Sequence, residues 1–189
     1  MAAEKLRKKL MEDTSLFPPG SFDQKDGHLG SPNVPVLTTF LTRKECSERG
    51  VHAPTTAGIF GSTTAGAYSI CVSSSYEDDK DNGETLIYTG TGGQEDSFGG
   101  AGPQVADQTF DHPSNAALKK SVETKYPVRV VRGPNRGSRY APESGYRYDG
   151  LYTVKSAYMG KGRSGYAICK YDLERLPNQP PIPINTKNK

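Results

Sequence analysis

The sequence predicts an α+β domain in which a twisted, barrel-like β-sheet is flanked by helices. Five short runs of residues that favour strands are separated by glycine-containing segments, and a helical stretch follows the second run. Many short strands with few helices are typical of a curved sheet or barrel that carries its helices on the outside. The predicted strands are residues 67–73, 85–89, 127–131, 151–157 and 164–170.

The chain before these strands is predicted to consist of a short helix and an arm rich in proline and glycine, residues 1–36. Leu6 and Leu10 lie four positions apart among Lys and Glu residues, which favours a helix. The basic run at 5–9 is compatible with a nuclear address and with an ordinary solvated helix face. Residues 13–36 are rich in Pro and Gly, so we expect an extended linker or an arm laid over the domain.

Two segments are candidates for helices beside the sheet. Residues 38–49 favour a helix or a strand, with Thr38 or Thr39 available as a cap. Residues 111–124 favour a helix, because positions 111–114 supply capping side chains and a proline, and helix-forming residues follow.

Two tyrosines, Tyr76 and Tyr88, lie on either side of a predicted chain reversal at 81–83. The Asn-Gly pair at this reversal is flanked by extended-type residues and favours a tight two-residue hairpin turn. Such a turn brings the two rings near each other, with the carboxylate of Asp79 alongside. Two aromatic faces and one hydrogen-bond acceptor suit a single flat ring such as a nucleobase.

Charge is distributed unevenly along the 189 residues, although the formal net charge is only +3. Residues 76–111 hold one Lys and nine Asp or Glu, whereas residues 119–175 hold thirteen Lys or Arg and five acidic residues. A basic surface beside an acidic loop is therefore expected. Clustered positive charge attracts phosphate backbones through counterion release, and an ordinary solvated face is the alternative.

The cysteines and the hydropathy pattern argue against several classes of protein. Cys46, Cys71 and Cys169 are odd in number and far apart, which disfavours a disulfide framework or a zinc site and predicts buried thiols. No stretch approaches the roughly 20 apolar residues of a membrane helix, and the N-terminus does not resemble a signal peptide. We therefore expect a soluble intracellular protein.

Motifs for catalysis, metal binding and cofactor binding are missing or incomplete. The glycine-rich runs at 90–93 and 99–102 are not followed by the Gly-Lys-Ser/Thr of a phosphate-binding loop. Segment 78–89 departs from a calcium-binding loop at ligand positions, and the motifs of zinc deaminases are absent. None of the three histidines stands in a pattern expected of a nuclease or a nucleophile triad. We expect no catalytic residue, no metal and no cofactor.

Seven short blocks of the sequence form a recognisable series: 50–61, 66–69, 76–79, 88–93, 127–132, 140–142 and 146–150. Together they make the chain resemble an SRA domain, also called a SET- and RING-associated or YDG domain, over about residues 38–176. We interpret Tyr148-Asp149-Gly150, which gives the family one of its names, as scaffold. The resemblance implies a PUA-like fold, with a twisted, barrel-like sheet and flanking helices, that flips modified cytosine out of duplex DNA.

The resemblance implies a pocket for the flipped base. Tyr76 and Tyr88 would stack on its two faces. Asp79 would accept a hydrogen bond from the cytosine N4 amino group, where thymine has a carbonyl, and Thr89 would hydrogen-bond the base edge. As bare sequence features, the tyrosines equally suit core packing, and Asp79 equally suits a solvated turn.

Small residues would form the wall of this pocket. Gly58 matches a position where backbone approaches the base closely, and Gly90 and Thr91 match the wall beside the 5-substituent. Ser73 and Ser75 stand where better-known relatives carry Ala and Gly. We hypothesise that one of these two hydroxyls faces the 5-substituent, so that the pocket accepts 5-hydroxymethylcytosine as well as 5-methylcytosine.

Two loops of the family probe the duplex where the base has left it. Thr56 matches the tip of the first loop, where a well-characterised subgroup has a Val. The second loop corresponds to 98–103, which is shorter and has Gly99 and Gly100 where the subgroup carries its Asn-Lys-Arg side chains. Because that loop gives preference for hemimethylated CpG, we expect weak discrimination between hemimethylated and fully methylated sites.

Nine basic residues are candidates for contacts to the DNA backbone, and the sequence does not indicate which of them face the duplex. Clustering alone makes them candidates, and some of them are expected to face solvent. They are Lys119, Lys120, Lys125, Arg129, Arg132, Arg136, Arg139, Arg147 and Lys161.

These features predict a non-enzymatic, nuclear reader of 5-methylcytosine in double-stranded DNA, without a membrane partner. The domain would span 37–176, followed by a Pro-rich tail at 177–189 that is extended and mobile. The first alternative is an enzyme acting on the flipped base, a glycosylase or nuclease component with Asp79 or another carboxylate as acid or base. The second is a structural or protein-interaction domain that has lost DNA binding.

Overall fold

The computed structural model describes residues 34–74, 76–97 and 100–188, which form a large sheet with two helices and a small hairpin. The eight-stranded sheet has the order β2-β3-β8-β9-β10-β5-β4, and β1 pairs with β9 beside this path. Only β3 and β8 run parallel among these described strands. The strands are β1 (Thr39–Phe40), β2 (Ile59–Ser62), β3 (Gly66–Val72), β4 (Lys80–Asp81), β5 (Thr85–Thr89), β8 (Val128–Arg132), β9 (Tyr146–Lys161) and β10 (Ala167–Arg175).

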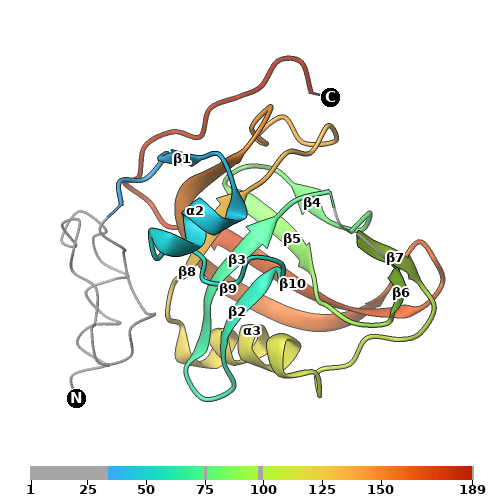
Figure 1. Cartoon of the computed structure of the whole chain (residues 1–189). Coiled ribbons are helices and arrows are strands. Elements are labelled where there is room, and N and C mark those ends of the chain that lie inside the picture. The colour runs from blue at the N-terminus through green and yellow to red at the C-terminus, as the bar shows by residue number, and fades with distance from the viewer. Residues whose placement is uncertain (1–33, 75, 98–99, 189) are drawn as a thin grey trace.

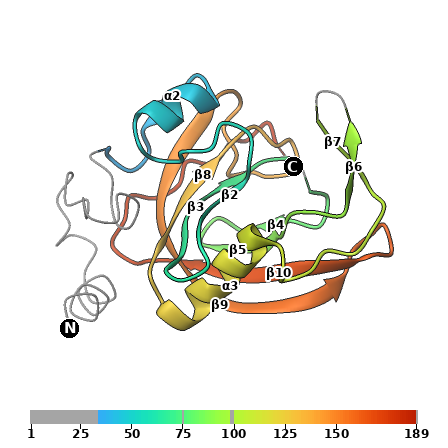
Figure 2. The same ribbon diagram turned by 60° about the horizontal axis from the view of Figure 1, so that its bottom comes forward.

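The helices and the hairpin surround a strongly curved sheet (Figures 1 and 2). Helix α3 (Pro113–Thr124) packs against β2, β3 and β9, and α2 (Arg43–Glu48) lies near β1. β6 (Gln94–Ser97) and β7 (Gly100–Gln104) form the separate hairpin. The prediction of an α+β fold with a twisted, barrel-like sheet is confirmed, although the sheet stays open because β2 and β4 do not pair in the described part of the chain.

Two apolar clusters hold the sheet and the helices together. The larger cluster joins buried residues of β3, β5, β8, β9 and β10 with Leu118 of α3. The smaller one packs Cys46 of α2 against Cys71 and Tyr148 of the sheet. Cys46, Cys71 and Cys169 are free and buried, as predicted from their spacing.

Local sequence explains where each helix begins, with one difference from the prediction. Helix α2 is capped by Thr42, whose hydroxyl accepts a hydrogen bond from the main-chain N–H of Glu45 at 3.1 Å. Thr38 and Thr39 are not caps, because the chain is still extended there and Thr39 belongs to β1. Helix α3 agrees with its predicted range and is capped by His112.

Two strands differ in extent from their predictions. β9 extends well beyond the predicted run 151–157 because β8 and β10 pair along its two edges. β10 begins three residues later than the predicted strand 164–170, since the chain first turns at Gly162 and Gly165. The N–H of Gly165 donates to the carbonyl of Gly162 at 2.9 Å, and Gly165 has a φ of 89°.

The C-terminal tail is extended, as predicted, but it packs along the domain. Leu151 N–H donates to Gln179 Oε1 at 2.8 Å, and Gln179 Nε2 donates to the Leu151 carbonyl at 2.9 Å. Ile182 is only 8% exposed and belongs to the larger apolar cluster. These contacts fix the tail, so residues 177–188 differ from the expected mobile segment.

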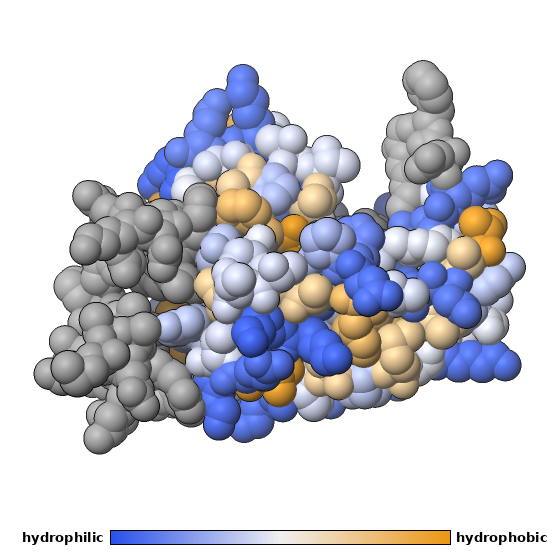
Figure 3. Space-filling view, turned by 90° about the horizontal axis from the view of Figure 1, so that it is seen from below, coloured by the Kyte–Doolittle hydropathy of each residue, from blue (hydrophilic) through white to orange (hydrophobic). Residues whose placement is uncertain are grey.

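The described residues contain no helix suited to span a membrane and no cluster of potential metal ligands. No helix in the described ranges is both long and apolar enough to cross a membrane. Three or more His, Cys, Asp or Glu do not gather into a potential metal site in that part of the chain. On the face seen in Figure 3, hydrophobic residues form small groups among hydrophilic ones.

Candidate nucleic-acid interface

The hairpin of β4 and β5 brings the predicted pocket residues to one place. Asp81 of β4 pairs with Leu86 of β5, so the chain reverses at 82–85, close to the predicted turn. Just before β4, Asp79 Oδ1 accepts a hydrogen bond from the main-chain N–H of Thr89 at 2.7 Å. The short connection therefore holds a carboxylate beside the end of β5.

Tyr88 is almost completely buried, and its hydroxyl links β5 to two other segments. Its exposed fraction is 3%, and the hydroxyl lies 3.2 Å from the carbonyl oxygen of Gly58 and 3.3 Å from that of Cys71. A Cβ on Gly58 would stand 2.6 Å from this hydroxyl, so a glycine is needed for the approach. Burial raises the pKa of Tyr88 well above its usual value, and the phenol stays neutral.

Tyr76 is half-buried and held by its hydroxyl, which lies 3.3 Å from Thr91 Oγ1 and 3.1 Å from Gln94 Oε1. Burial also raises the pKa of Tyr76. No ring contact joins Tyr76 and Tyr88 in the described part of the chain, so neither ring covers a face of the other. The carboxylate of Asp79 lies near both phenols, and its negative charge adds to the rise in their pKa values.

Asp79 and Thr89 supply buried polar groups beside these rings. Burial raises the pKa of Asp79 to about 7, even though the amide of Thr89 donates to it. The hydroxyl of Thr89 is also buried. It makes no hydrogen bond of ordinary geometry among the described residues, although it lies close enough to Asp79 to help lower the pKa of that carboxyl group. A buried hydroxyl gains free energy from a well-aligned hydrogen bond, which the edge of a bound molecule can supply.

Two buried amides fix the strand end that carries Gly90 and Thr91. Asn115 of α3 accepts from Thr91 N–H and donates to the Thr91 carbonyl, both at 2.8 Å. Gln108 Nε2 donates to the Gly90 carbonyl at 2.8 Å. Neither amide is predicted from sequence as a site residue, although an Asn inside the first turns of an alanine-rich helix is a weak signal of a tertiary hydrogen bond.

Thr56 is exposed at the tip of a loop that side chains from other segments hold in place. Arg43 Nη2 donates to the carbonyls of Pro54 and Ala57 at 2.9 and 2.6 Å. The ring of His52 lies 2.9 Å from the Ala57 carbonyl, and burial lowers its pKa to about 4, so the ring is neutral. Arg43 and His52 are further residues that local sequence patterns did not mark for this loop.

The remaining predicted site residues lie at the edges of this region or outside the described ranges. Ser73 follows β3, and its Cβ would lie 3.5 Å from a Cβ placed on Gly133 at the end of β8. Gly100 is the first residue of β7. Ser75 and Gly99 lie outside the described residues.

Three of the nine candidate DNA-binding cations are structural instead. Arg129, Arg132 and Arg147 are only 1%, 0% and 6% exposed. Arg132 and Arg147 both bind the buried carboxylate of Asp149, at 2.8 and 2.5 Å, and Arg129 Nε donates to the carbonyl of Val51 at 2.8 Å. The prediction that these three cations are available to phosphates is wrong, because β8 and β9 are central strands. Asp149 acts as scaffold, as interpreted from sequence.

The sequence of this chain, including the YDG segment with its buried carboxylate, matches a known protein family. A family model described as "SAD/SRA domain" matches residues 28–179. The chain belongs to the SAD/SRA domain family. This confirms the resemblance stated from the sequence motifs.

Several curated proteins contain SRA sequences similar to this one. The "UHRF1-like protein" of Cryptococcus neoformans is 46% identical over 165 residues, covering 83% of this chain and 48% of that protein. The "E3 ubiquitin-protein ligase ORTHRUS 2" of Arabidopsis thaliana is 44% identical over 176 residues, covering 87% of this chain and 26% of that protein. The chain therefore spans about half the length of such relatives, or less.

Solved SRA structures share the fold. The structure described as "SUVH5 SRA bound to fully hydroxymethylated CG DNA" has a TM-score of 0.68 and 36% identity, covering 82% of this chain and 97% of that chain. A "Modification dependent TagI restriction endonuclease" has a TM-score of 0.74 and 36% identity, covering 80% of this chain and 53% of that chain. Both similarities confirm the predicted fold class.

Proposed function

We propose that this chain is a reader of 5-methylcytosine in double-stranded DNA that holds the modified base flipped out of the duplex. The carrying observation is the group of Tyr76, Asp79, Tyr88 and Thr89, in which two tyrosines lie near a half-buried carboxyl group and the buried hydroxyl of Thr89. A carboxylate accepts from the N4 amino group of cytosine and rejects the carbonyl that thymine has there.

The same group can recover the cost of flipping. Extrusion of a base costs a few kcal/mol, and stacking on an aromatic side chain contributes about 1–3 kcal/mol. Gly58, Gly90 and Thr91 are proposed to form the pocket wall, which the amides of Asn115 and Gln108 keep rigid. A wall that is already ordered loses little conformational entropy on binding.

We propose that 5-hydroxymethylcytosine is accepted as well. The relative SUVH5 is described as bound through its SRA domain to fully hydroxymethylated CG DNA. In this chain the hydroxyl of Ser73 or Ser75 would form a hydrogen bond with the hydroxyl group of 5-hydroxymethylcytosine. A nuclear location and an SRA domain spanning 37–176 are part of the same proposal, because the ligand is duplex DNA and the named relatives with similar sequences are eukaryotic.

The proposed function is binding without catalysis. If Asp79 is engaged by the N4 amino group, it is turned away from the glycosidic bond that a glycosylase must break. The test is prolonged incubation with an end-labelled methylated duplex, followed by alkaline treatment and a denaturing gel. Intact strands are expected, whereas an abasic site or a strand break would establish the enzyme alternative.

The central experiment measures binding to otherwise identical duplexes carrying cytosine, 5-methylcytosine or 5-hydroxymethylcytosine, at fixed salt. We expect preference for the modified duplexes, and we expect Tyr76→Ala to lower their affinity by about 5- to 150-fold, which corresponds to about 1–3 kcal/mol. Asp79→Ala should lower the affinity for the modified duplexes towards that for the cytosine duplex, because a flipped cytosine of any kind loses the acceptor for its N4 amino group.

A control variant separates the pocket from general effects of losing a tyrosine. Tyr158→Ala removes an exposed ring of β9 whose hydroxyl lies 3.0 Å from Asp172 Oδ1, and it should bind like the wild type. Fluorescence of 2-aminopurine opposite the modified base reports loss of stacking on flipping. Equal affinity of the wild type for all three duplexes, or an unchanged fluorescence signal, would contradict the proposal.

A further inference from the structure

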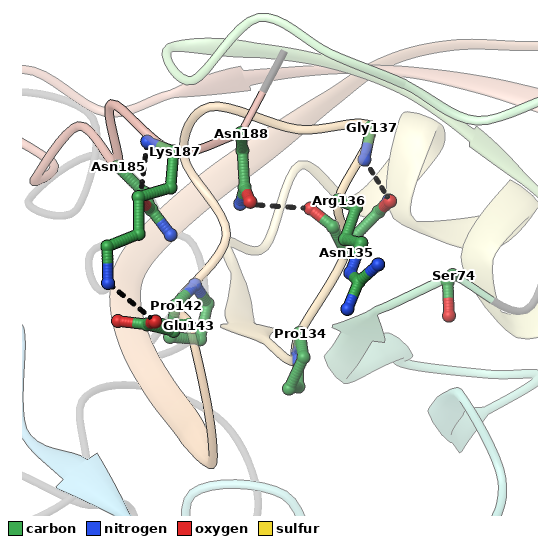
Figure 4. A pocket seen from close by; sticks show the side chains of 10 residues that line it. All are labelled: Ser74, Pro134, Asn135, Arg136, Gly137, Pro142, Glu143, Asn185, Lys187 and Asn188. Carbon is green, nitrogen blue, oxygen red and sulfur yellow. Dashed lines mark hydrogen bonds and ion pairs between the residues drawn. The ribbon is translucent and has the colours of Figure 1, made fainter.

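A polar hollow of about 960 Å³ lies between the connection from β8 to β9 and the C-terminal tail (Figure 4). Seven of its ten lining residues have polar side chains, and two of these side chains are cationic. Its lining includes Ser74, Asn135, Arg136, Glu143, Lys187 and Asn188.

The walls of the hollow are held in position by hydrogen bonds. Asn188 Nδ2 donates to the carbonyls of Asn135 and Ser138 at 3.1 and 2.9 Å. The N–H of Asn185 donates to the carbonyl of Arg139 at 2.7 Å. The tail is therefore attached to the connection 134–143 at several points.

The cations of the hollow are available to an anion. Arg136 is exposed and makes no ion pair within the described ranges. Lys187 Nζ lies 2.8 Å from Glu143 Oε1, but both side chains are about 70% exposed, at 72% and 67%, so this pair is weak and exchangeable. Figure 4 shows Arg136 and Lys187 on opposite walls of the hollow.

The hollow shares Ser74 with a second hollow that reaches one residue of the proposed base pocket, Tyr76. The second hollow, of about 310 Å³, also has Gln94 in its wall. Gln94 lies within hydrogen-bond distance of the Tyr76 hydroxyl. A strand whose base reaches Tyr76 can therefore place a neighbouring phosphate group near Ser74 and the larger hollow.

We propose that this hollow receives a backbone phosphate of the DNA strand next to the flipped base, with Arg136 and Lys187 as the cationic donors. The inference rests on the proposed function of the base pocket. It adds a DNA contact from the C-terminal tail, since Lys187 lies beyond residues 28–179, which match the family.

The test is the salt dependence of binding to methylated and unmethylated duplexes for Arg136→Ala, Lys187→Ala and Glu143→Gln. Each lost phosphate contact should reduce the slope of log K against log salt by about 0.9 and weaken binding by about five- to tenfold at 0.1 M salt, equally for both duplexes. Glu143→Gln should strengthen binding, because it removes a repelling charge and frees Lys187.

A phosphate site requires Lys187→Ala to weaken DNA binding and Glu143→Gln to strengthen it, whereas a structural ion pair does not. If both variants weaken binding and lower the melting temperature alike, the pair is structural and the proposal is wrong. Lys155→Ala is the matched control, because Lys155 pairs with Glu174 at 3.7 Å, is 59% exposed and does not line the hollow. Its slope should equal that of the wild type.

Two further outcomes identify the source of the phosphate and the part of the proposal that fails. Inorganic phosphate at matched ionic strength should compete poorly with the duplex, and strong competition that Arg136→Ala removes would assign the hollow to free phosphate instead. If the wild type prefers methylated DNA, but Arg136→Ala and Lys187→Ala have the same salt-dependence slope as the wild type, only the proposed phosphate site is wrong. If the wild type does not prefer methylated DNA, the proposed base pocket is wrong.

Discussion

The side chain of Asp79 combines a scaffold contact, to Thr89, with a proposed contact to the ligand. Asp79 Oδ1 accepts from the Thr89 N–H at 2.7 Å, and burial raises the pKa of the carboxyl group to about 7. Near neutral pH the group is therefore divided between its protonated and ionised forms. The ionised form is the stronger acceptor for the N4 amino group of cytosine.

The raised pKa of Asp79 predicts pH-dependent binding. As the pH falls from about 8 to about 6, the carboxylate becomes protonated, so affinity for a 5-methylcytosine duplex should decrease, by at most about tenfold per pH unit below the pKa. His52 stays neutral over this range because burial lowers its pKa to about 4. Fluorescence anisotropy at constant ionic strength measures the effect.

The matched variant for this prediction is Asp79→Asn, which keeps the shape of the side chain and removes its titration. Its affinity should be lower than that of the wild type at pH 8 and nearly constant between about pH 6 and 8. Parallel pH profiles for Asp79→Asn and the wild type would show that another group is responsible.

At the scale of single elements, strand β4 is only two residues long and depends on ion pairs with its neighbours. Arg132 of β8 donates to both carboxylate oxygens of Asp81, at 2.8 and 2.9 Å, and to Asp149 of β9 at 2.8 Å. Ser138 also donates to Asp81, at 2.5 Å. The buried guanidinium thus connects three strands and holds the hairpin that carries Asp79.

Removal of this guanidinium should destabilise the fold strongly. Arg132→Met leaves the carboxylate of Asp81 without a cation among the described residues and leaves Asp149 with Arg147 alone. We expect the free energy of unfolding to fall by about 3–5 kcal/mol in urea denaturation. Lys44→Met is the control, because Lys44 and Glu48 form an exposed pair on α2 at 3.8 Å. It should change the free energy of unfolding by at most about 0.5 kcal/mol, and an equal loss in both variants would refute the assigned role of Arg132.

At the scale of the whole molecule, the hairpin of β6 and β7 stands apart from the main sheet (Figure 2). The loop of Thr56 lies between α2 and β2. The resemblance to the SRA family implies that these two loops probe the duplex where the base has left it, and we propose the same here. Here the first loop ends in a small polar side chain, and the sequence of the second loop is rich in glycine.

This arrangement predicts weak discrimination between hemimethylated and fully methylated CpG duplexes. Without long side chains in the second loop, the opposite strand is not read, so the two affinities should differ by less than about tenfold, or about 1.4 kcal/mol. Competition of each unlabelled duplex against one labelled duplex measures the ratio. A preference for hemimethylated DNA well above tenfold would contradict the prediction.

Much of this fold and pocket follows from short stretches of sequence. Strand-favouring runs, the Asn-Gly turn and the helix at 111–124 depend on contacts between near neighbours, so their positions could be predicted to within a few residues. The association of Tyr76, Asp79 and Tyr88 is similarly local, because one hairpin joins them. The longer strand β9 was less predictable, since its length is set by pairing with β8 and β10.

Sequence alone therefore determined the family, the α+β class and the residues proposed to hold a base, because these depend on motifs and on one turn. Only the tertiary structure decided which cations are buried in the scaffold, as Arg132 is, and which remain exposed, as Arg136 is. It also decided that Asn115, Arg43 and the tail support the site. Burial and long-range hydrogen bonds depend on how distant strands pack, and the order of residues in one strand does not contain that information.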